Sequence, residues 1–181
     1  MVSAARRSVC RAATLLVLSA AIVAVAEVRA PEYEVKAAFL YNFAKFVEWP
    51  PGSERNTHAF RICLVGDDPF GALLTETVAG KTVQDRPIEI AHPDSAPELG
   101  RCQMAFIPRS QVRQLPRLLA GLTGASTLTV GETEDFARGG GMITFHIEEN
   151  KVRFEINAEA AQRAGLRISS QLLKLATRVT Q

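Results

Sequence analysis

The side chains most able to do chemistry in this chain of 181 residues are scattered along it. Its three histidines, His58, His92 and His146, lack the spacing of a metal-binding pair on one helix. The sequence contains no nucleophile-elbow, Walker or dinucleotide-binding glycine motif, and Ser126 has no recognisable base partner. We therefore predict a non-enzymatic protein with no catalytic residue, no cofactor and no metal, although a metal site assembled from distant segments stays open.

Two adjacent carboxylates, Asp67 and Asp68, follow an apolar segment that ends at Val65. Open α/β sheets bind ligands beyond their strand ends, so the pair could hold a cation or serve a hydrolase as acid and base. The Asp68-Pro69 pair also fits the start of a helix, because aspartate caps helices and proline suits their first turn. Capping is the interpretation we favour.

An aromatic segment offers a different kind of site. Residues 32–48 have the apolar periodicity of a helix, which the prolines after Trp49 end. The expected buried stripe consists of Val35, Phe39, Phe43 and Phe46. Leu40, Tyr41 and Val47 lie off that stripe. The helix is therefore either buried on two sides or exposes aromatic anchors for a protein partner.

Strict alternation of apolar residues after the Gly139–Gly141 run predicts an antiparallel hairpin. Pairing 143 with 156, 145 with 154 and 147 with 152 places six apolar side chains on one face, with the turn at 148–151. The other face carries Met142, Thr144 and His146 opposite Arg153 and Glu155, and is either solvated or a second contact surface. The glycine run could bind an anion through its amides, but a flexible turn is the interpretation we favour. The candidate partner-binding residues are Tyr41, Phe46, Trp49, His146, Arg153, Glu155 and Arg163.

The remaining segments alternate between strand and helix patterns. Strands are expected at residues 59–65, 87–91, 103–107 and 126–130. Helices are expected from Asp68 to Val78 and from Ser110 to Leu119, the latter broken at Pro116. Asn157 caps a helical turn, and Ser169 or Ser170 caps a final helix. The buried stripe of that final helix is expected to hold Leu172, Leu175, Ala176 and Val179. The chain is predicted to be an α/β protein with a central mixed β-sheet, a parallel part plus the C-terminal antiparallel hairpin, flanked by helices on both faces.

The first 26 residues have the composition of a secretory signal peptide. Arg6, Arg7 and Arg11 precede an apolar run over residues 12–26, which ends on the small residues of a cleavage site. That run reaches only about 22 Å as a helix, short of the ~30 Å core of a membrane, so an anchor is the less favoured alternative. The mature chain is then predicted to be one domain, residues 27–181, in the periplasm.

Export also changes the interpretation of charge and of the cysteines. Of the 21 basic residues three lie in the leader, which holds none of the 19 acidic ones, so the mature chain carries 18 against 19, a net charge of −1. The basic balance is therefore no evidence for nucleic-acid binding. Cys63 and Cys102 remain, and in an oxidising compartment such a pair favours a disulfide over two buried thiols.

Three segments resemble the YfiR family of periplasmic repressors: KAAFLYNFAKFVEWP (36–50), GGMITFHIEENKVRFEIN (140–157) and LRISSQLLKLA (166–176). The intervening segments RICLVGDDPFG and CQMAFIP fit the same order, so the resemblance covers nearly the whole mature chain. It implies a homodimeric regulator that binds the periplasmic part of a membrane diguanylate cyclase, YfiN, and keeps it inactive. An outer-membrane lipoprotein, YfiB, would sequester the repressor, so that cyclic di-GMP and biofilm formation rise. The resemblance also implies a Cys63–Cys102 disulfide. A periplasmic small-molecule sensor, using the crevice beyond Val65 and Ile107, is the alternative function.

Overall fold

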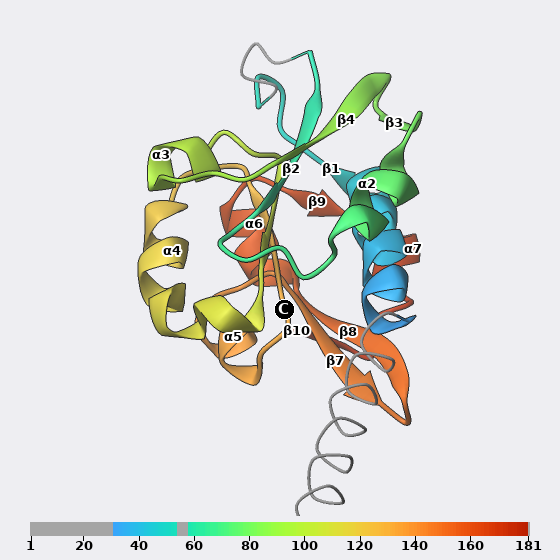
Figure 1. Cartoon of the computed structure of the whole chain (residues 1–181). Helices are drawn as coiled ribbons and strands as arrows, with labels where there is room; N and C mark the ends of the chain where they lie inside the picture. Colours follow the sequence, from blue (N-terminus) through green and yellow to red (C-terminus); the bar gives the residue numbers. More distant parts are fainter. Residues whose placement is uncertain (1–30, 54–57, 181) are drawn as a thin grey trace, which may run out of the picture.

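The computed structural model describes residues 31–53 and 58–180, and its centre is a curled β-sheet (Figure 1). The leader expected at 1–26 lies outside the described residues. Eight strands lie in the order β10-β8-β7-β6-β5-β2-β4-β3. Their bounds are β2 Phe60–Leu64, β3 Thr82–Val83, β4 Arg86–Ala91, β5 Met104–Ile107, β6 Leu128–Gly131, β7 Ile143–Glu148, β8 Lys151–Asn157 and β10 Arg178–Thr180. A separate antiparallel pair joins β1 (Val47–Glu48) to β9 (Arg167–Ile168).

The sheet is mixed, as the alternating strand and helix patterns predict. Strands β4, β2, β5, β6 and β7 are parallel, β8 is antiparallel to β7, and β10 is parallel to β8. The chain passes from β2 to β4 on one side and then returns to β5 on the other side of β2. This is the order of doubly wound sheets, in which successive connections cover opposite faces. The four strands expected in the parallel part all exist, with ends shifted by one or two residues.

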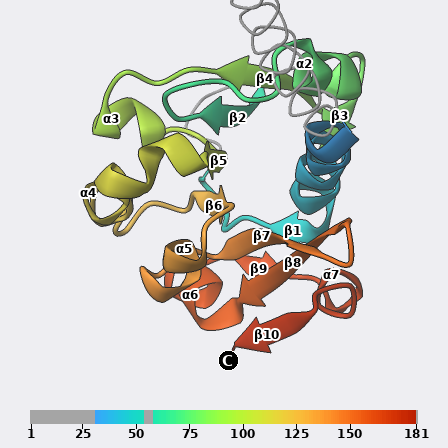
Figure 2. The same cartoon turned by 60° about the horizontal axis from the view of Figure 1, so that its bottom comes forward.

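The first face of the sheet is covered by an N-terminal helix over residues 31–46, together with α2 (Ala72–Val78), α6 (Ala158–Arg163) and α7 (Ser170–Leu173). The N-terminal helix, α2 and α7 stand on one side of the sheet, and α3, α4 and α5 stand on the other (Figures 1 and 2). Alternate side chains of the strands, such as Ile62, Phe106 and Phe145, pack beneath the first group in the larger core. Burial of these side chains is the main force that stabilises the fold.

The buried stripe of the N-terminal helix differs from the expected one. Leu40 and Val47, placed off the stripe by the sequence, are buried, whereas Val35 is 43% exposed. Phe39 is half-buried and packs on Phe154, with ring centroids 5.3 Å apart. Phe43 is fully buried as predicted, but Ala37, Leu40 and Ala44, which the predicted stripe left out, are buried beside it.

The second face carries a smaller core beneath α3 (Ala96–Leu99), α4 (Leu115–Gly121) and α5 (Glu134–Arg138). The disulfide between Cys63 and Cys102 lies inside it, with a Cα–Cα distance of 6.0 Å, which confirms the predicted pairing. The expected helix from Ser110 is instead a 3-10 turn, η1 (Arg109–Gln114), followed by α4 with Pro116 in its first turn. Proline ends one helix and begins the other because it lacks an N–H.

The hairpin has the predicted register, with Ile143 opposite Ile156, Phe145 opposite Phe154 and Ile147 opposite Val152. Its turn residues Glu149 and Asn150 have positive φ angles, as a two-residue hairpin turn requires.

The C-terminal helix was predicted too long. Ser169 does cap it through the N–H of Leu172, but it ends at Leu173. Residues 178–180 instead form β10 beside β8, because an exposed sheet edge offered backbone partners that the sequence pattern does not reveal.

Candidate functional site

Beyond α5, the second face of the sheet becomes polar. The β7, β8 and β10 strands contribute no residue to the smaller core beneath α3, α4 and α5. On this face, His146 of β7 lies beside Arg153 of β8. Glu155 of β8 lies between Thr144 of β7 and Arg178 of β10. We call this surface the outer face of the hairpin. The same face is thus apolar under helices at one end and polar at the other.

A groove of about 1130 Å³ runs along the outer face of the hairpin. Residues that follow β5 and β6 form one wall, α5 forms another, and β7, β8 and β10 form the floor. Its charged groups have both signs, and the cations are Arg109, Arg138 and Arg178. Glu155 accepts a hydrogen bond from Arg178 Nε at 2.8 Å, and the hydroxyl of Thr177 lies 3.4 Å from His146 Nε2. Polar groups of both signs suit a charged polypeptide surface better than an apolar ligand.

Glu132, which lines the groove, belongs to a buried ion pair. Lys36 of the N-terminal helix is 2% exposed, and its Nζ lies 2.5 Å from Glu132 Oε2 and 2.5 Å from Glu32 Oε1. Glu132 follows β6 directly and has a side chain that is only 3% exposed. The pair therefore ties the helix on the first face to the strand ends that border the groove on the second.

Glu132 has further partners that satisfy its carboxylate. Oε1 accepts a hydrogen bond of 2.9 Å from the backbone N–H of Arg109, and the Tyr33 hydroxyl lies 3.2 Å from each carboxylate oxygen. Burial raises the pKa of the Tyr33 hydroxyl above its usual value, and the negative charge of Glu132 raises it further. Tyr33 thus stays protonated and donates to Glu132.

A tight packing contact fixes α5 at the rim of the groove. Phe136 is buried, and a Cβ atom built on Gly141 would lie 2.1 Å from its ring. Gly140, with φ of +96°, then turns the chain toward β7. The glycine run is accounted for by this turn and this close approach, in agreement with the interpretation we favoured.

The sequence profile of the YfiR/HmsC-like family matches residues 33–177, which is most of the chain. The chain belongs to the YfiR/HmsC-like family. Proteins of this family are periplasmic, non-catalytic regulators of cyclic di-GMP signalling that act through protein–protein interaction.

Two solved structures match this YfiR/HmsC-like chain at low sequence identity. A conserved domain protein from Vibrio cholerae matches at 12% identity and a TM-score of 0.51, over 71% of this chain and 57% of that one. An ABC domain in complex with L-Trp from Streptococcus pneumonia matches at 14% identity and a TM-score of 0.48, over 66% and 54%. The chain thus spans little more than half of each. The first likeness concerns the α/β fold alone.

The seven candidate residues of this YfiR/HmsC-like chain fall into two groups. His146, Arg153 and Glu155 lie together on the outer face of the hairpin. The other four lie elsewhere, and two of them have clear structural contacts. Trp49 donates from Nε1 to the Gln103 carbonyl at 3.0 Å, and Arg163 pairs with Glu159 on α6 at 2.6 Å.

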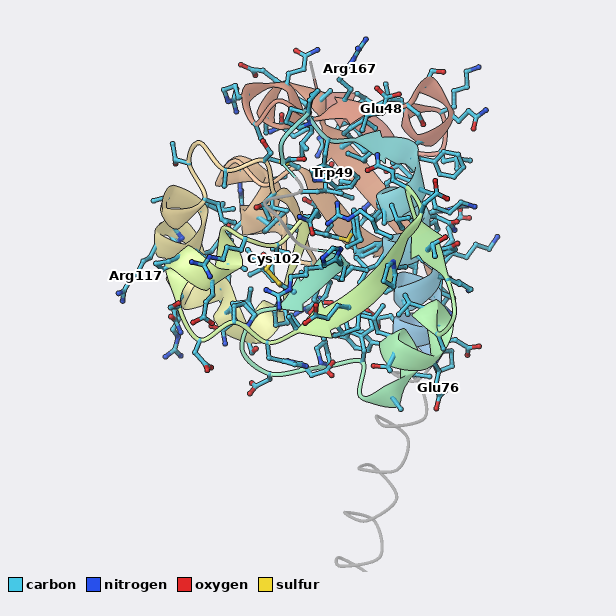
Figure 3. All side chains as sticks on the ribbon, turned by 90° about the horizontal axis from the view of Figure 1, so that it is seen from above. Glu48, Trp49, Glu76, Cys102, Arg117 and Arg167 are labelled. Carbon is cyan, nitrogen blue, oxygen red and sulfur yellow. A yellow bond between two sulfur atoms is a disulfide. The ribbon has the colours of Figure 1, made fainter. Side chains whose placement is uncertain are left out.

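Tyr41 and Phe46 are half-buried on the N-terminal helix, near Lys45 and Lys81. Trp49 lies inward of Glu48 and Arg167, neighbours in the β1–β9 pair (Figure 3). The sequence therefore predicted three residues of one surface and four residues of others, and their partner-binding role remains a prediction.

The sequence analysis missed Arg109, Glu132 and Arg178, which line the groove, and Lys36, which pairs with Glu132. A signal existed for two of them. Lys36 interrupts an apolar helix, and Glu132 follows a buried strand at the edge of the sheet where ligand-binding groups gather.

The capping interpretation of Asp67 and Asp68 is confirmed in part. Asp68 Oδ1 accepts from the N–H groups of Phe70 and Gly71 at 2.8 and 3.2 Å, but this caps a turn, and α2 begins later, at Ala72. Within residues 31–53 and 58–180 no cluster of three or more His, Cys, Asp or Glu could hold a metal ion. No helix in the same ranges is long and apolar enough to cross a membrane.

Proposed function

We propose that this chain is a repressor that binds the periplasmic part of a membrane diguanylate cyclase, of the YfiN kind, and thereby lowers cyclic di-GMP output and biofilm formation. Its docking surface is the outer face of the hairpin. The observation that carries the proposal is the change of this sheet face from apolar and covered to polar and grooved.

The chemistry of the outer face supports a protein partner. A solvated sheet face needs no groove, yet here α5 and the strand ends form walls around His146, Glu155 and Arg178. Arg153 is exposed beside His146 and lies in no ion pair among the described residues. An exposed arginine next to a histidine and a carboxylate can pair with charges of a partner and set the register of the complex.

The mechanism is stoichiometric. A repressor that binds only the inactive conformation of the cyclase stabilises that conformation by its binding free energy. The free energy by which the cyclase equilibrium shifts equals the difference between the binding free energies for its two conformations. Repression therefore requires no chemical step. An outer-membrane lipoprotein of the YfiB kind would reverse the effect if it competed for the same face.

The same proposal includes the compartment and the assembly. Residues 1–26 act as a cleaved secretory leader, and residues 27–181 are the exported domain. The chain works as a homodimer in the periplasm, where the Cys63–Cys102 disulfide stabilises it.

The test uses the processed chain purified from the periplasm. The wild-type chain is crosslinked to the envelope, captured partners are searched for a cyclase domain, and binding to the purified periplasmic part of that cyclase is measured by calorimetry. The test variant is Arg153→Glu. The matched control is Arg117→Glu, which makes the same charge change at an exposed arginine that points outward from α4 (Figure 3).

We expect the dissociation constant to be at least tenfold larger for Arg153→Glu and unchanged for Arg117→Glu. The charge reversal turns attractive contacts with the partner into repulsive ones only where the residue lies at the interface. Cyclic di-GMP in cells lacking the chain should fall on complementation with wild type and less with Arg153→Glu. Equal binding by both variants would exclude the outer face as docking surface, and unchanged cyclic di-GMP would exclude repression.

The volume of the groove also keeps the sensor function open as a second candidate. The groove lies beyond β6 and β7 rather than in the expected crevice beyond Val65 and Ile107, where Gln111 packs against Gly66. A small periplasmic metabolite that bound it would raise the melting temperature, since ligands of the native state stabilise it. A shift abolished by Thr144→Val but not by Arg117→Glu would assign the ligand to the groove.

A further inference from the structure

The tip of the hairpin exposes an apolar side chain between acidic ones. Ile147 is 51% exposed although it continues the buried stripe of Phe145 on the first face. The N-terminal helix packs on Phe145 and leaves the tip beyond it uncovered. Glu148 and Glu149 follow directly and are exposed, and neither lies in an ion pair among the described residues. The tip is an apolar knob with an acidic rim.

An apolar groove of about 410 Å³ lies at the opposite edge of the sheet, between the end of α2 and the β3–β4 hairpin. Val78, Pro87, Ile88 and Ile90 line it, and Lys81 is the one charged residue among its lining residues. Ile88 and Ile90 are only half-buried, so the apolar wall is accessible.

Positive charge gathers beside this groove. Lys81 Nζ lies 4.6 Å from the ring centre of Tyr41, and Lys45 Nζ lies 5.5 Å from the same ring. Both lysines are exposed, and neither belongs to an ion pair in residues 31–53 and 58–180. Two cations over one aromatic ring repel each other, so an acidic partner here would gain from both.

The tip of the β7–β8 hairpin and the β3–β4 hairpin, whose residues line the smaller groove, lie on opposite sides of the N-terminal helix (Figures 1 and 2). A twofold axis through the middle of that helix would place the tip of each copy at the groove of the other. Such an interface is isologous, since the same two patches are used twice, and the dimer closes without forming a filament. The half-exposed Val35 and Tyr41 would lie near the axis.

We propose that the chain dimerises by reciprocal insertion of the hairpin tip, centred on Ile147, into the groove beside Lys81 of a second copy. The occupant is a second copy because this chain itself carries the apolar and acidic complement of the groove. The inference rests on the homodimer included in the proposed function and names its surface. Most of the outer face of the hairpin lies on the other side of the sheet, but Ile147 and Glu148 also line the larger groove, so the tip contact covers one border of it.

The test measures self-association of the processed, periplasmically purified chain by sedimentation equilibrium, with native mass spectrometry of mixtures. Ile147→Asp should weaken dimerisation about 100-fold, because a charge replaces the apolar anchor. Lys81→Glu and Glu149→Lys should each weaken it about tenfold. Mixing Lys81→Glu with Glu149→Lys should restore a mixed dimer, since both contacts then join opposite charges. Arg117→Glu, on α4, is the control and should dimerise as wild type.

The outcomes separate this inference from the proposed function. If the wild-type chain dimerises and all three variants dimerise equally well, the reciprocal contact is wrong while the homodimer stands. The same holds if Lys81→Glu and Glu149→Lys do not form a mixed dimer. A monomeric wild-type chain at hundreds of micromolar overturns both the contact and the homodimer. Cyclase binding is measured in parallel on Lys81→Glu, which is remote from the outer face, because Ile147 also borders the larger groove. Unfolding temperatures establish that each variant is folded.

Discussion

The two halves of the second sheet face are built from similar strands, but they differ in the polarity of their side chains and in whether helices cover them. In the half formed by β2 and β5, the side chains on this face, such as Cys63, Ala105 and Ile107, are apolar, and α3, α4 and α5 cover them. In the half formed by β7, β8 and β10, the equivalent positions hold residues such as Thr144, His146 and Glu155, and a groove lies above them. The opposite face is apolar in both halves.

This difference predicts that substitutions in the covered half change the stability of the fold, whereas substitutions in the open half change partner binding. Apolar surface covered by helices contributes about 25 cal/mol for each Å² removed from water, so substitutions in the covered half act on folding. Polar positions on an open face contribute little to folding, and substitutions there usually change stability by less than about 0.5 kcal/mol. Under the proposed function, the polar residues of the open half serve partner binding rather than folding.

The largest effect is expected where the two halves meet. Lys36→Met leaves the Glu132 carboxylate buried without its cation and should lower the free energy of unfolding by about 3–5 kcal/mol, as measured by urea titration. The matched control is the double variant Lys36→Met/Glu132→Leu. Removing both charges should recover most of the loss, because a buried ion pair barely exceeds its own desolvation cost. A single variant that loses less than about 1 kcal/mol would mean that the carboxylate is protonated or solvated.

The disulfide should give the next largest effect, and it acts only on the covered half. Cys63→Ala/Cys102→Ala removes a cross-link between residues 39 apart in sequence, and should cost about 2–4 kcal/mol, mainly because the unfolded chain regains freedom. Reduction of the wild-type chain should produce the same shift in urea midpoint, whereas the double variant should not respond to reductant. Binding of the cyclase should stay unchanged at a temperature where both chains are folded.

The sequence predicted the covered half better than the open one. The parallel strands follow from short apolar runs that alternate with helix patterns. In the open half the hairpin register was also predicted, from strict apolar alternation, since a shift by one residue would turn every side chain to the wrong face. The Cys63–Cys102 pair follows from the compartment and from the family resemblance. These features depend on local patterns or on the properties of single residues.

The open half depends on contacts between segments distant in sequence, which no local pattern encodes. Strand β10 pairs with β8 although Val179 fits a helical stripe, because the edge of the sheet supplies backbone partners. Lys36 and Glu132 meet across 96 residues, and neither has a neighbour in sequence that identifies the other. His146, Arg153 and Glu155 were found because the hairpin register alone brings them together.

A smaller effect is expected at the boundary helix α5. Gly141→Ala places a methyl group against the ring of Phe136 and should destabilise the chain by about 1–3 kcal/mol through overpacking. Phe136→Leu in the same background should be less costly than in the wild type, because the smaller side chain relieves the contact. Independent, additive losses in this double-mutant cycle, measured by thermal unfolding, would show that α5 moves aside instead.

The smallest effect on folding is expected in the open half itself. Arg178 pairs with Glu155 on the outer face of the hairpin, and its own side chain is 71% exposed. Since solvent screens such a pair, Arg178→Ala should change the free energy of unfolding by no more than about 1 kcal/mol, and 1 M salt should remove the difference. Cyclase binding should respond far more strongly than stability, because the arginine borders the groove. If Arg178→Ala lowered the free energy of unfolding by more than about 2 kcal/mol and left cyclase binding unchanged, the open half would be a structural surface like the covered one.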